Sequence, residues 1–440
     1  MQIDMTEGNA ARHLIAFAIP IVLGNMFQLT YNAVDSIIVS RAAGTAALAA
    51  VGTAAPVMNI IILGVSGLTI GASVLISRAF GAHETEEIKK AFSSLIVLGL
   101  VFSGTVALLA ILGTKAFLRL LKVPQEILPA ASSYLRLILI GTVFTYLYNA
   151  YTAAMRAIGD STTPVRYLMI ASLVNIALDL IFIAVFRWGV TGAALATVLS
   201  QALSALLCIR FNQKGETLLH LHRTSFHPDK ETMKETISLG AVTALQQSCQ
   251  PVGKLLIQGV INTLGVGTIA VFDAVSKIEQ FALIPEQSIS HALMTFTGQN
   301  RGARDKKRIK EGIFTGLSLE LCYAFFILIA LKLLKTPLVA LFLTDHGLVR
   351  LGAEYLSLMA AFYFFSGLTN GIQGFFRGMA RMGYTVLGTM IQITFRVIFT
   401  FVLVPRLGLF GLAYATAIGW LCMIICHYPL AYITYKRIKF

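Results

Sequence analysis

The sequence contains few charged residues and few cysteines. Only 13% of its 440 residues are charged, whereas a typical soluble domain has about 25%. All five cysteines lie in or at the edge of apolar segments, so they do not form the spaced pattern of a disulfide framework. These absences exclude an ordinary soluble domain and a small disulfide-stapled secreted domain.

Several catalytic motifs are also missing from the sequence. The chain has no Gly-Lys-Ser/Thr phosphate-binding loop, no His-Glu-x-x-His helix and no nucleophile elbow. Cys422, Cys426 and His427 are close in sequence, but a fourth ligand and a hydrophilic surround are lacking, so we interpret them as packing residues. We therefore expect no enzymatic activity and no cofactor, and no metal site beyond a Na⁺ site at the polar residues described below.

Long apolar runs take up most of the chain. Hydrophobic residues make up 56% of the sequence, and runs of about 20 residues, the length that crosses a bilayer, recur along it. The first run extends from Leu14 to about Ser40, which is too long for a signal-peptide core, so we interpret it as a retained helix. The pattern predicts an all-α polytopic membrane protein with twelve transmembrane helices near residues 14–40, 47–76, 91–113, 127–153, 165–185, 190–209, 236–262, 267–296, 312–334, 351–374, 384–404 and 409–434.

The two halves of the chain repeat each other at a nearly constant offset. Arg156 returns as Arg377, Asn149 returns as Asn370, and the polar segment 71–82 returns as 292–303. Six helices per half is an even number, so both halves must enter the membrane from the same side. The sequence therefore predicts two parallel six-helix lobes, 1–210 and 236–440, joined by a linker at 211–235 and related by a pseudo-two-fold axis along the membrane normal. Such duplicated lobes are typical of transporters, in which a cavity between the lobes opens alternately to each side.

The basic residues indicate the orientation in the membrane. If both termini are cytoplasmic, 22 of the 35 lysines and arginines lie in cytoplasmic segments and nine in outer loops. This bias follows the positive-inside rule. The net charge of +14 is then a topology signal, and we expect no nucleic-acid partner because no soluble basic module exists. We expect a multi-pass protein of the inner (plasma) membrane with a cytoplasmic linker.

Polar residues inside the predicted helices of the first half are candidates for ion binding. Asp35, Asp179 and Thr197 each lie six to eight residues from the outer end of a predicted helix, a depth of roughly 9–12 Å at 1.5 Å per residue. Asn175 lies one helical turn before Asp179. Two carboxylates, an amide oxygen and a hydroxyl at one level suit a monovalent cation or a shared proton. The alternative is that the two acids only fix helix packing by pairing with arginines or backbone groups.

The second half has a different set of polar residues. Arg396 and Thr400 stand at the positions of the second repeat that correspond to Asn175 and Asp179, so we expect coupling ions to bind the first half alone. Glu279 could line the cavity or neutralise Lys254, and Asn149 and Asn370 could line the cavity or make interhelical hydrogen bonds. Roles for Lys254, Lys277 and Arg396 remain open at this point.

Several motifs in order resemble the multidrug and toxic compound extrusion (MATE) family. They are Val34-Asp35-Ser36, Ser77-Arg78-Ala-Phe-Gly81-Ala82, Arg156-Ala-Ile-Gly159-Asp160-Ser-Thr-Thr-Pro164, Asn175 with Asp179, and Gly189-Val-Thr-Gly192-Ala-Ala before Thr197. The resemblance implies export of amphipathic, often cationic compounds by alternating access, in exchange for H⁺ or Na⁺. The rival interpretation is a lipid-linked glycan flippase of the same superfamily, which the cations Lys254, Lys277, Arg136 and Arg396 keep open.

Within the family the sequence is similar to the DinF-like pattern. This pattern implies a first-lobe cation site made of Asp35, Asn175, Asp179 and Thr197. A NorM-like pattern would add second-lobe acids on helices 7 and 10, where this chain has Gln246 with Gln247 and Asn370. We expect the substrate cavity to be lined by Gln28, Tyr31, Asn149, Glu279 and Asn370. The expected partners are small amphipathic substrates and the lipid bilayer, with the chain working as a monomer.

Overall fold

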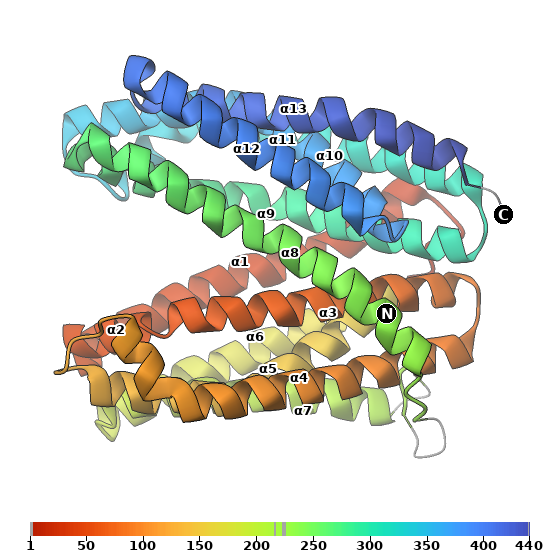
Figure 1. Cartoon of the computed structure of the whole chain (residues 1–440), viewed down its shortest axis with the longest axis horizontal. Coiled ribbons are helices and arrows are strands. Elements are labelled where there is room, and N and C mark those ends of the chain that lie inside the picture. Colours follow the sequence, from red (N-terminus) through yellow and green to blue (C-terminus); the bar gives the residue numbers. More distant parts are fainter. Residues whose placement is uncertain (1–2, 215–216, 222–225, 439) are drawn as a thin grey trace. The chain divides into compact units, whose positions relative to one another are not determined.

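The computed structural model describes residues 3–214, 217–221, 226–438 and 440. Within these residues the predicted all-α fold is confirmed, and each of the twelve predicted helices is present (Figure 1). The helices of the first half are α1 (Ala10–Ala43), α2 (Thr45–Gly52), α3 (Ala55–Gly81), α4 (Thr85–Leu120), α5 (Leu128–Ala157), α6 (Thr162–Asp179) and α7 (Gly189–Lys214). The helices of the second half are α8 (Lys230–Ile261), α9 (Val266–Gly302), α10 (Lys306–Ala340), α11 (His346–Gly378), α12 (Met382–Leu407) and α13 (Leu409–Lys436).

Two predicted helices of the first half are interrupted. The helix predicted at 47–76 consists of α2 and α3, because Pro56 in the first turn of α3 has no backbone N–H to donate to the preceding turn. The helix predicted at 165–185 ends in a six-residue π-helix, η1 (Leu180–Val185), directly after Asp179. Single π-turns of this kind occur frequently at functional sites.

The predicted linker at 211–235 is partly helical. The helix α7 continues to Lys214 and α8 already begins at Lys230, while residues 215–216 and 222–225 lie outside the described residues. Asp229 caps α8 by accepting hydrogen bonds from the backbone N–H of Thr232, at 2.8 Å, and from its hydroxyl, at 2.7 Å. These hydrogen bonds hold the pKa of the Asp229 carboxyl below its ordinary value. A short η2 (Asn262–Leu264) separates α8 from α9.

The chain divides into two compact units. Unit 1 comprises Met1–Ile3 and Leu23–Ala241, and unit 2 comprises Asp4–Val22 and Val242–Phe440. In unit 1, α5 packs against α3, α4 and α7, and α6 packs against α7. In unit 2, α11 packs against α9, α10 and α13, and α12 packs against α13. The helices α9, α10 and α11 are the equivalents of α3, α4 and α5 in the second repeat. The two units therefore pack equivalent helices against each other in the same way.

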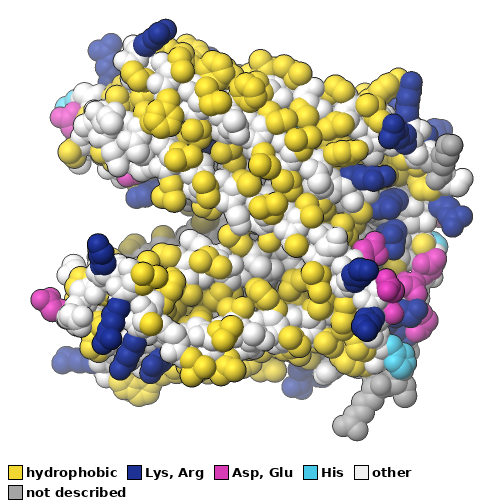
Figure 2. Space-filling view, in the orientation of Figure 1, with side chains coloured by type: hydrophobic (Ala, Val, Ile, Leu, Met, Phe, Trp, Pro, Cys, Tyr) yellow, Lys and Arg dark blue, Asp and Glu magenta, His cyan; other side chains and the backbone are white. Residues whose placement is uncertain are grey.

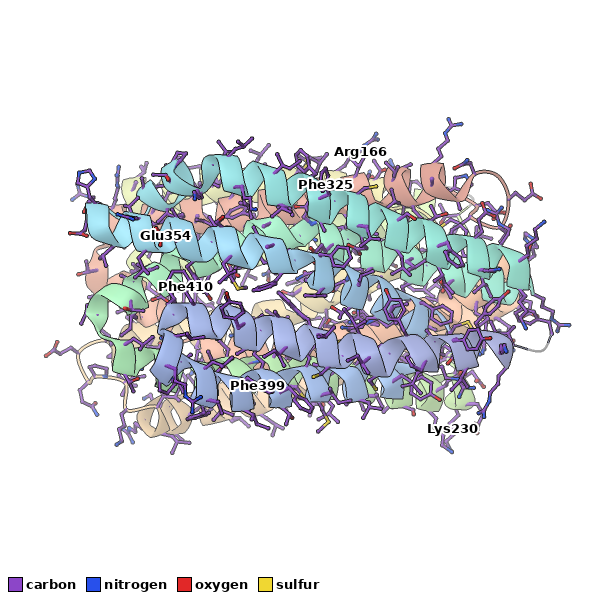
Figure 3. All side chains as sticks on the ribbon, turned by 90° about the horizontal axis from the view of Figure 1, so that it is seen from above. Arg166, Lys230, Phe325, Glu354, Phe399 and Phe410 are labelled. Atoms are coloured by element: carbon purple, nitrogen blue, oxygen red, sulfur yellow. The ribbon has the colours of Figure 1, made fainter. Side chains whose placement is uncertain are left out.

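The helices have the length and surface of membrane-spanning segments. Ten helical segments of the described residues are long and apolar enough to cross a membrane. The remaining two, α8 and α9, have 32 and 37 residues and are more polar. Hydrophobic side chains cover the flanks of the helices, whereas lysines and arginines gather at the helix ends (Figure 2). Large side chains such as Phe325 on α10 are exposed there (Figure 3), as expected for a lipid-facing surface.

Candidate functional site

Asp35 of α1 and Asp179 of α6 form a carboxyl pair in unit 1. Asp179 is fully buried and Asp35 is half-buried. Their side chains lie close enough to share a hydrogen bond. Both carboxyl oxygens of Asp179 and Oδ1 of Asp35 are buried without a hydrogen-bond donor. Two ionised carboxylates at this separation repel each other, so the pair is stable only with a proton or another cation between the oxygens.

The surroundings of this pair come from three further elements. Asn175, one turn before Asp179 on α6, is buried, and its side-chain nitrogen has no acceptor. Tyr134 of α5 lies near enough to both acids to interact with them electrostatically. The π-helix η1 begins directly after Asp179, and α7 packs against it where Gly192 approaches Phe182. Sequence reasoning missed Tyr134, because an aromatic residue in an apolar run carries no local signal of its neighbours.

Thr197 is placed differently from the other predicted ligands. It lies on α7, and its hydroxyl donates to the carbonyl of Ala193 on its own helix at 2.9 Å. The structure therefore brings Asp35 and Asp179 together, whereas the Thr197 hydroxyl is engaged with its own backbone. Its membership of the cation site stays a prediction.

The predicted cavity residues of unit 1 occupy two helices. Gln28 and Tyr31 share one face of α1 and interact through their side chains, and Tyr31 also interacts electrostatically with Asp35 one turn later. Asn149 on α5 donates to the carbonyl of Thr145 at 2.7 Å. The α1 residues thus lie beside the carboxyl pair.

In unit 2, Glu279 of α9 accepts a hydrogen bond from the hydroxyl of Tyr363 at 3.0 Å. It also interacts electrostatically with Arg396 of α12 and, more weakly, with Lys254 of α8. These contacts provide the intramembrane acid with counter-charges. Lys277 instead lies over the ring of Phe342, 5.5 Å from its centroid.

The position that holds a helix 7 acid in the NorM-like pattern carries an amide network here. Gln246 of α8 donates to Gln373 of α11 and to Thr389 of α12, while Thr385 and Arg377 donate to its carbonyl oxygen. Its amide is therefore engaged by neutral groups and by one arginine. This arrangement binds helices of unit 2 together and provides no carboxylate for a cation.

Asn370, the other predicted cavity residue of unit 2, contacts an acid that sequence reasoning missed. Its side-chain nitrogen donates to the carbonyl of Ser366 at 3.1 Å and lies 3.4 Å from Glu286 of α9. Glu286 is fully buried. Two features of the sequence could have identified Glu286. It is a glutamate inside a predicted membrane helix, and the corresponding residue of the first repeat is the apolar Val65.

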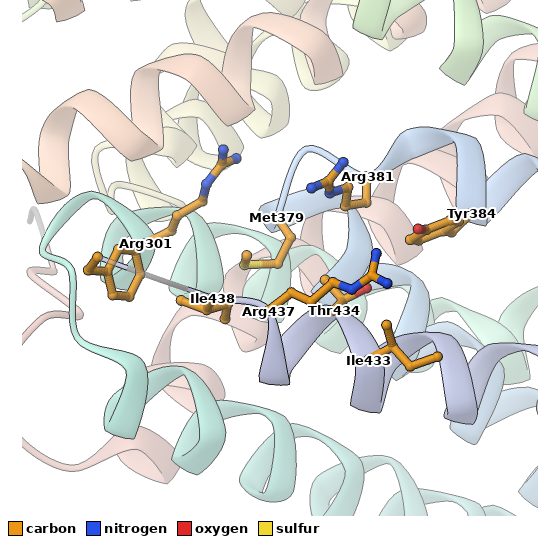
Figure 4. Close-up of a pocket in the computed structure, with 9 residues that line it drawn as sticks. Arg301, Met379, Arg381, Tyr384, Ile433, Thr434, Arg437 and Ile438 are labelled. Carbon is orange, nitrogen blue, oxygen red and sulfur yellow. The ribbon is translucent and has the colours of Figure 1, made fainter.

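A basic pocket lies at the end of unit 2 near the C-terminus. It has a volume of about 240 Å³ and is lined by Arg301, Arg381 and Arg437 together with Tyr384 and Thr434 (Figure 4). The pocket lies where α9, α11 and α13 end, so it concentrates positive charge at one end of the unit. This end is the one that the sequence assigns to the cytoplasm.

Long membrane-spanning helices, a duplicated packing pattern and a buried carboxyl pair define the class of polytopic membrane transporters. The profile of the MatE family matches residues 20–181 and 243–402, one match in each half of the chain. The chain therefore belongs to the MatE family, a family of membrane-embedded transporters, and the predicted family resemblance is confirmed.

Individual relatives agree with this assignment. The chain is 28% identical over 380 residues to a probable multidrug resistance protein, YpnP, of Bacillus subtilis, covering 86% of this chain and 85% of the relative. It is 24% identical over 420 residues to the multidrug export protein MepA of Staphylococcus saprophyticus, covering 95% and 91%. A solved structure of a multidrug resistance MATE family transporter of the MOP superfamily, in an outward-facing conformation, matches with a TM-score of 0.91 at 23% identity, covering 99% and 98%. That structural match establishes the fold.

Proposed function

We propose that this protein is a cation-coupled antiporter that exports amphipathic, often cationic compounds by alternating access, in exchange for H⁺ or Na⁺. The observation that carries the proposal is the Asp35–Asp179 pair, in which three buried carboxyl oxygens have no hydrogen-bond donor. A site of this kind binds a cation readily and loses it when the surroundings change. Export of drugs is supported by relatives described as multidrug resistance and multidrug export proteins.

The coupling is tested by transport from proteoliposomes in which the sodium and proton gradients are imposed separately. We expect efflux of a fluorescent cationic dye such as ethidium to be driven by one of the two gradients and to stop when that gradient is collapsed. Gradient-independent leakage at the rate of empty liposomes would contradict the proposal. A build-up of lipid-linked precursors on depletion of the protein from cells would favour a flippase instead.

We further propose that both termini and the 211–235 linker are cytoplasmic, in a plasma membrane, and that the chain works as a monomer. The support for this orientation is the set of basic residues at one end of the helices, including the pocket of Arg301, Arg381 and Arg437.

The orientation predicts the outcome of cysteine labelling in intact cells. In a cysteine-free background, Lys230→Cys at the exposed start of α8 should react only with a membrane-permeant reagent. Glu126→Cys, in the exposed segment between α4 and α5, is the matched control and should react with an impermeant reagent from outside. The opposite result at the two positions would invert the topology and place the Asp35–Asp179 pair in the inner half of the membrane.

A further inference from the structure

Unit 2 contains a second pair of buried acids, Glu286 on α9 and Glu320 on α10. Both side chains are fully buried. Both carboxyl oxygens of Glu320 and Oε1 of Glu286 have no hydrogen-bond partner. The two groups are close enough to interact electrostatically. Neither acid belongs to the site in unit 1 or to the Glu279–Arg396 interaction.

The two acids meet the same turn of α11. Glu286 accepts a hydrogen bond from the hydroxyl of Ser366 at 2.6 Å. Glu320 packs against the backbone of the next residue, Gly367, where an added Cβ would lie 3.5 Å from Oε2. One turn later, Asn370 lies 3.4 Å from Glu286, and a Cβ at Gly371 would lie 3.5 Å from Cγ of Glu320. Small and polar residues of α11 therefore make the space that the two carboxyl groups occupy.

The repeat shows that this pair is specific to unit 2. The residues of the first repeat that correspond to Glu286 and Glu320 are Val65 and Gly99. In unit 1 the space beside Gly99 is filled by Tyr146, which is fully buried and is the equivalent of Gly367. A phenol against a glycine in unit 1 thus corresponds to a carboxyl group against a glycine in unit 2. Unit 1 therefore shows that the helices can pack closely at this position without an acid.

Among the described residues, neither Glu286 nor Glu320 interacts with a lysine or an arginine. Two phenols interact electrostatically with the pair, those of Tyr323 on α10 and Tyr363 on α11. Tyr323 donates to the carbonyl of Ala282, and Tyr363 donates to Glu279. Two neighbouring buried acids disfavour each other's ionisation, so at least one of them must hold a proton.

We propose that Glu286 and Glu320 form a proton-binding site in unit 2, in which two neighbouring buried carboxyl groups take up and release a proton. A proton suits the site better than Na⁺, because the only other side chains that bond to Glu286 among the described residues are Ser366 and Asn370, and the space is closed to solvent. We expected ions to bind the first half alone because Arg396 and Thr400 replace Asn175 and Asp179 in the second repeat. This site uses other positions and gives the second half its own titrating group. Its role in transport depends on the proposed antiport, but proton binding itself does not.

The test is infrared difference spectroscopy of the full-length protein in lipid between acid and alkaline pH. The Asp35→Asn/Asp179→Asn background removes the carboxyl pair of unit 1. In this background we expect a carboxylic-acid C=O band that disappears at alkaline pH. The band should be lost when Glu286→Gln and Glu320→Gln are added, because glutamine has the shape of a protonated glutamate and cannot titrate. Glu311→Gln, at an exposed position of the same helix as Glu320, is the matched control and should leave the band unchanged.

Each outcome decides the proposal. Each single glutamine variant should shift the midpoint of the titration, because the remaining carboxyl group has lost the neighbouring acid whose charge disfavours its ionisation. A band that survives both glutamine substitutions, or carboxyl groups that stay protonated at every pH at which the protein is folded, would overturn the proposal. Displacement of the band by sodium at constant pH would also overturn it and assign the site to Na⁺. Because unit 1 has no titrating pair in this background, these results are independent of whether Asp35 and Asp179 drive transport.

Discussion

Replacing Asp35 or Asp179 with asparagine is expected to reduce ion-driven efflux to the rate of empty liposomes while the protein still folds. Asparagine keeps the size and polarity of the side chain but cannot bind and release a cation as a carboxylate does. Because the two carboxyl groups lie against each other, each single variant should have this effect. The measurement is dye efflux from proteoliposomes under the driving gradient, at matched protein content.

Two controls make this result specific. Glu126→Gln removes an exposed acid of unit 1 outside the pair and should transport at the wild-type rate. Cation binding can be followed separately by the fluorescence of Trp188, whose ring stacks on Phe182 of η1 at 5.2 Å. The sequence has only two tryptophans, so a Trp420→Phe background isolates this signal. If only one of the two aspartates mattered for efflux and for the fluorescence change, the shared site would be wrong.

Gly99→Ala is expected to destabilise the protein strongly. A Cβ at Gly99 would lie 1.4 Å from Cζ of Tyr146. The Tyr146 ring is fully buried, and its hydroxyl donates to the carbonyl of Leu95 at 2.6 Å, so it cannot move aside cheaply. Overpacking of this kind costs about 1–3 kcal/mol. The free energy of unfolding in detergent should fall by at least this amount, and the yield of folded protein should fall with it.

The matched control for this substitution is Gly104→Ala on the same helix. A Cβ at Gly104 has no heavy atom within 4 Å, so the only effect is the higher helix propensity of alanine, worth up to about 1 kcal/mol. The two substitutions should therefore change stability in opposite directions. Equal effects would mean that Tyr146 does not occupy the space beside Gly99, and would remove the contrast between the units on which the comparison with Glu320 depends.

The sequence by itself determined the features that depend on local composition and on the repeat. Apolar runs of membrane-spanning length identify the helices, because each helix satisfies its own backbone hydrogen bonds in lipid. Motifs of the first half that return in the same order in the second half identify the duplication. The depth of Asp35 and Asp179 followed from counting residues at a fixed rise per residue, which is why both were candidates before their contact was known.

Only the tertiary structure decided which polar side chains meet. Asp35 and Asp179 lie far apart in the sequence, on α1 and α6, and counting residues gives their depth but not the rotation of each helix about its axis. In unit 2, the rotations of α9 and α10 bring Glu286 and Glu320 to one turn of α11. In unit 1, the Thr197 hydroxyl bonds to a carbonyl of its own helix. The rotation of a helix is set by packing against its neighbours. A helix with apolar residues on every side gives little indication of that packing in its sequence, because its hydrophobic pattern does not mark one buried face.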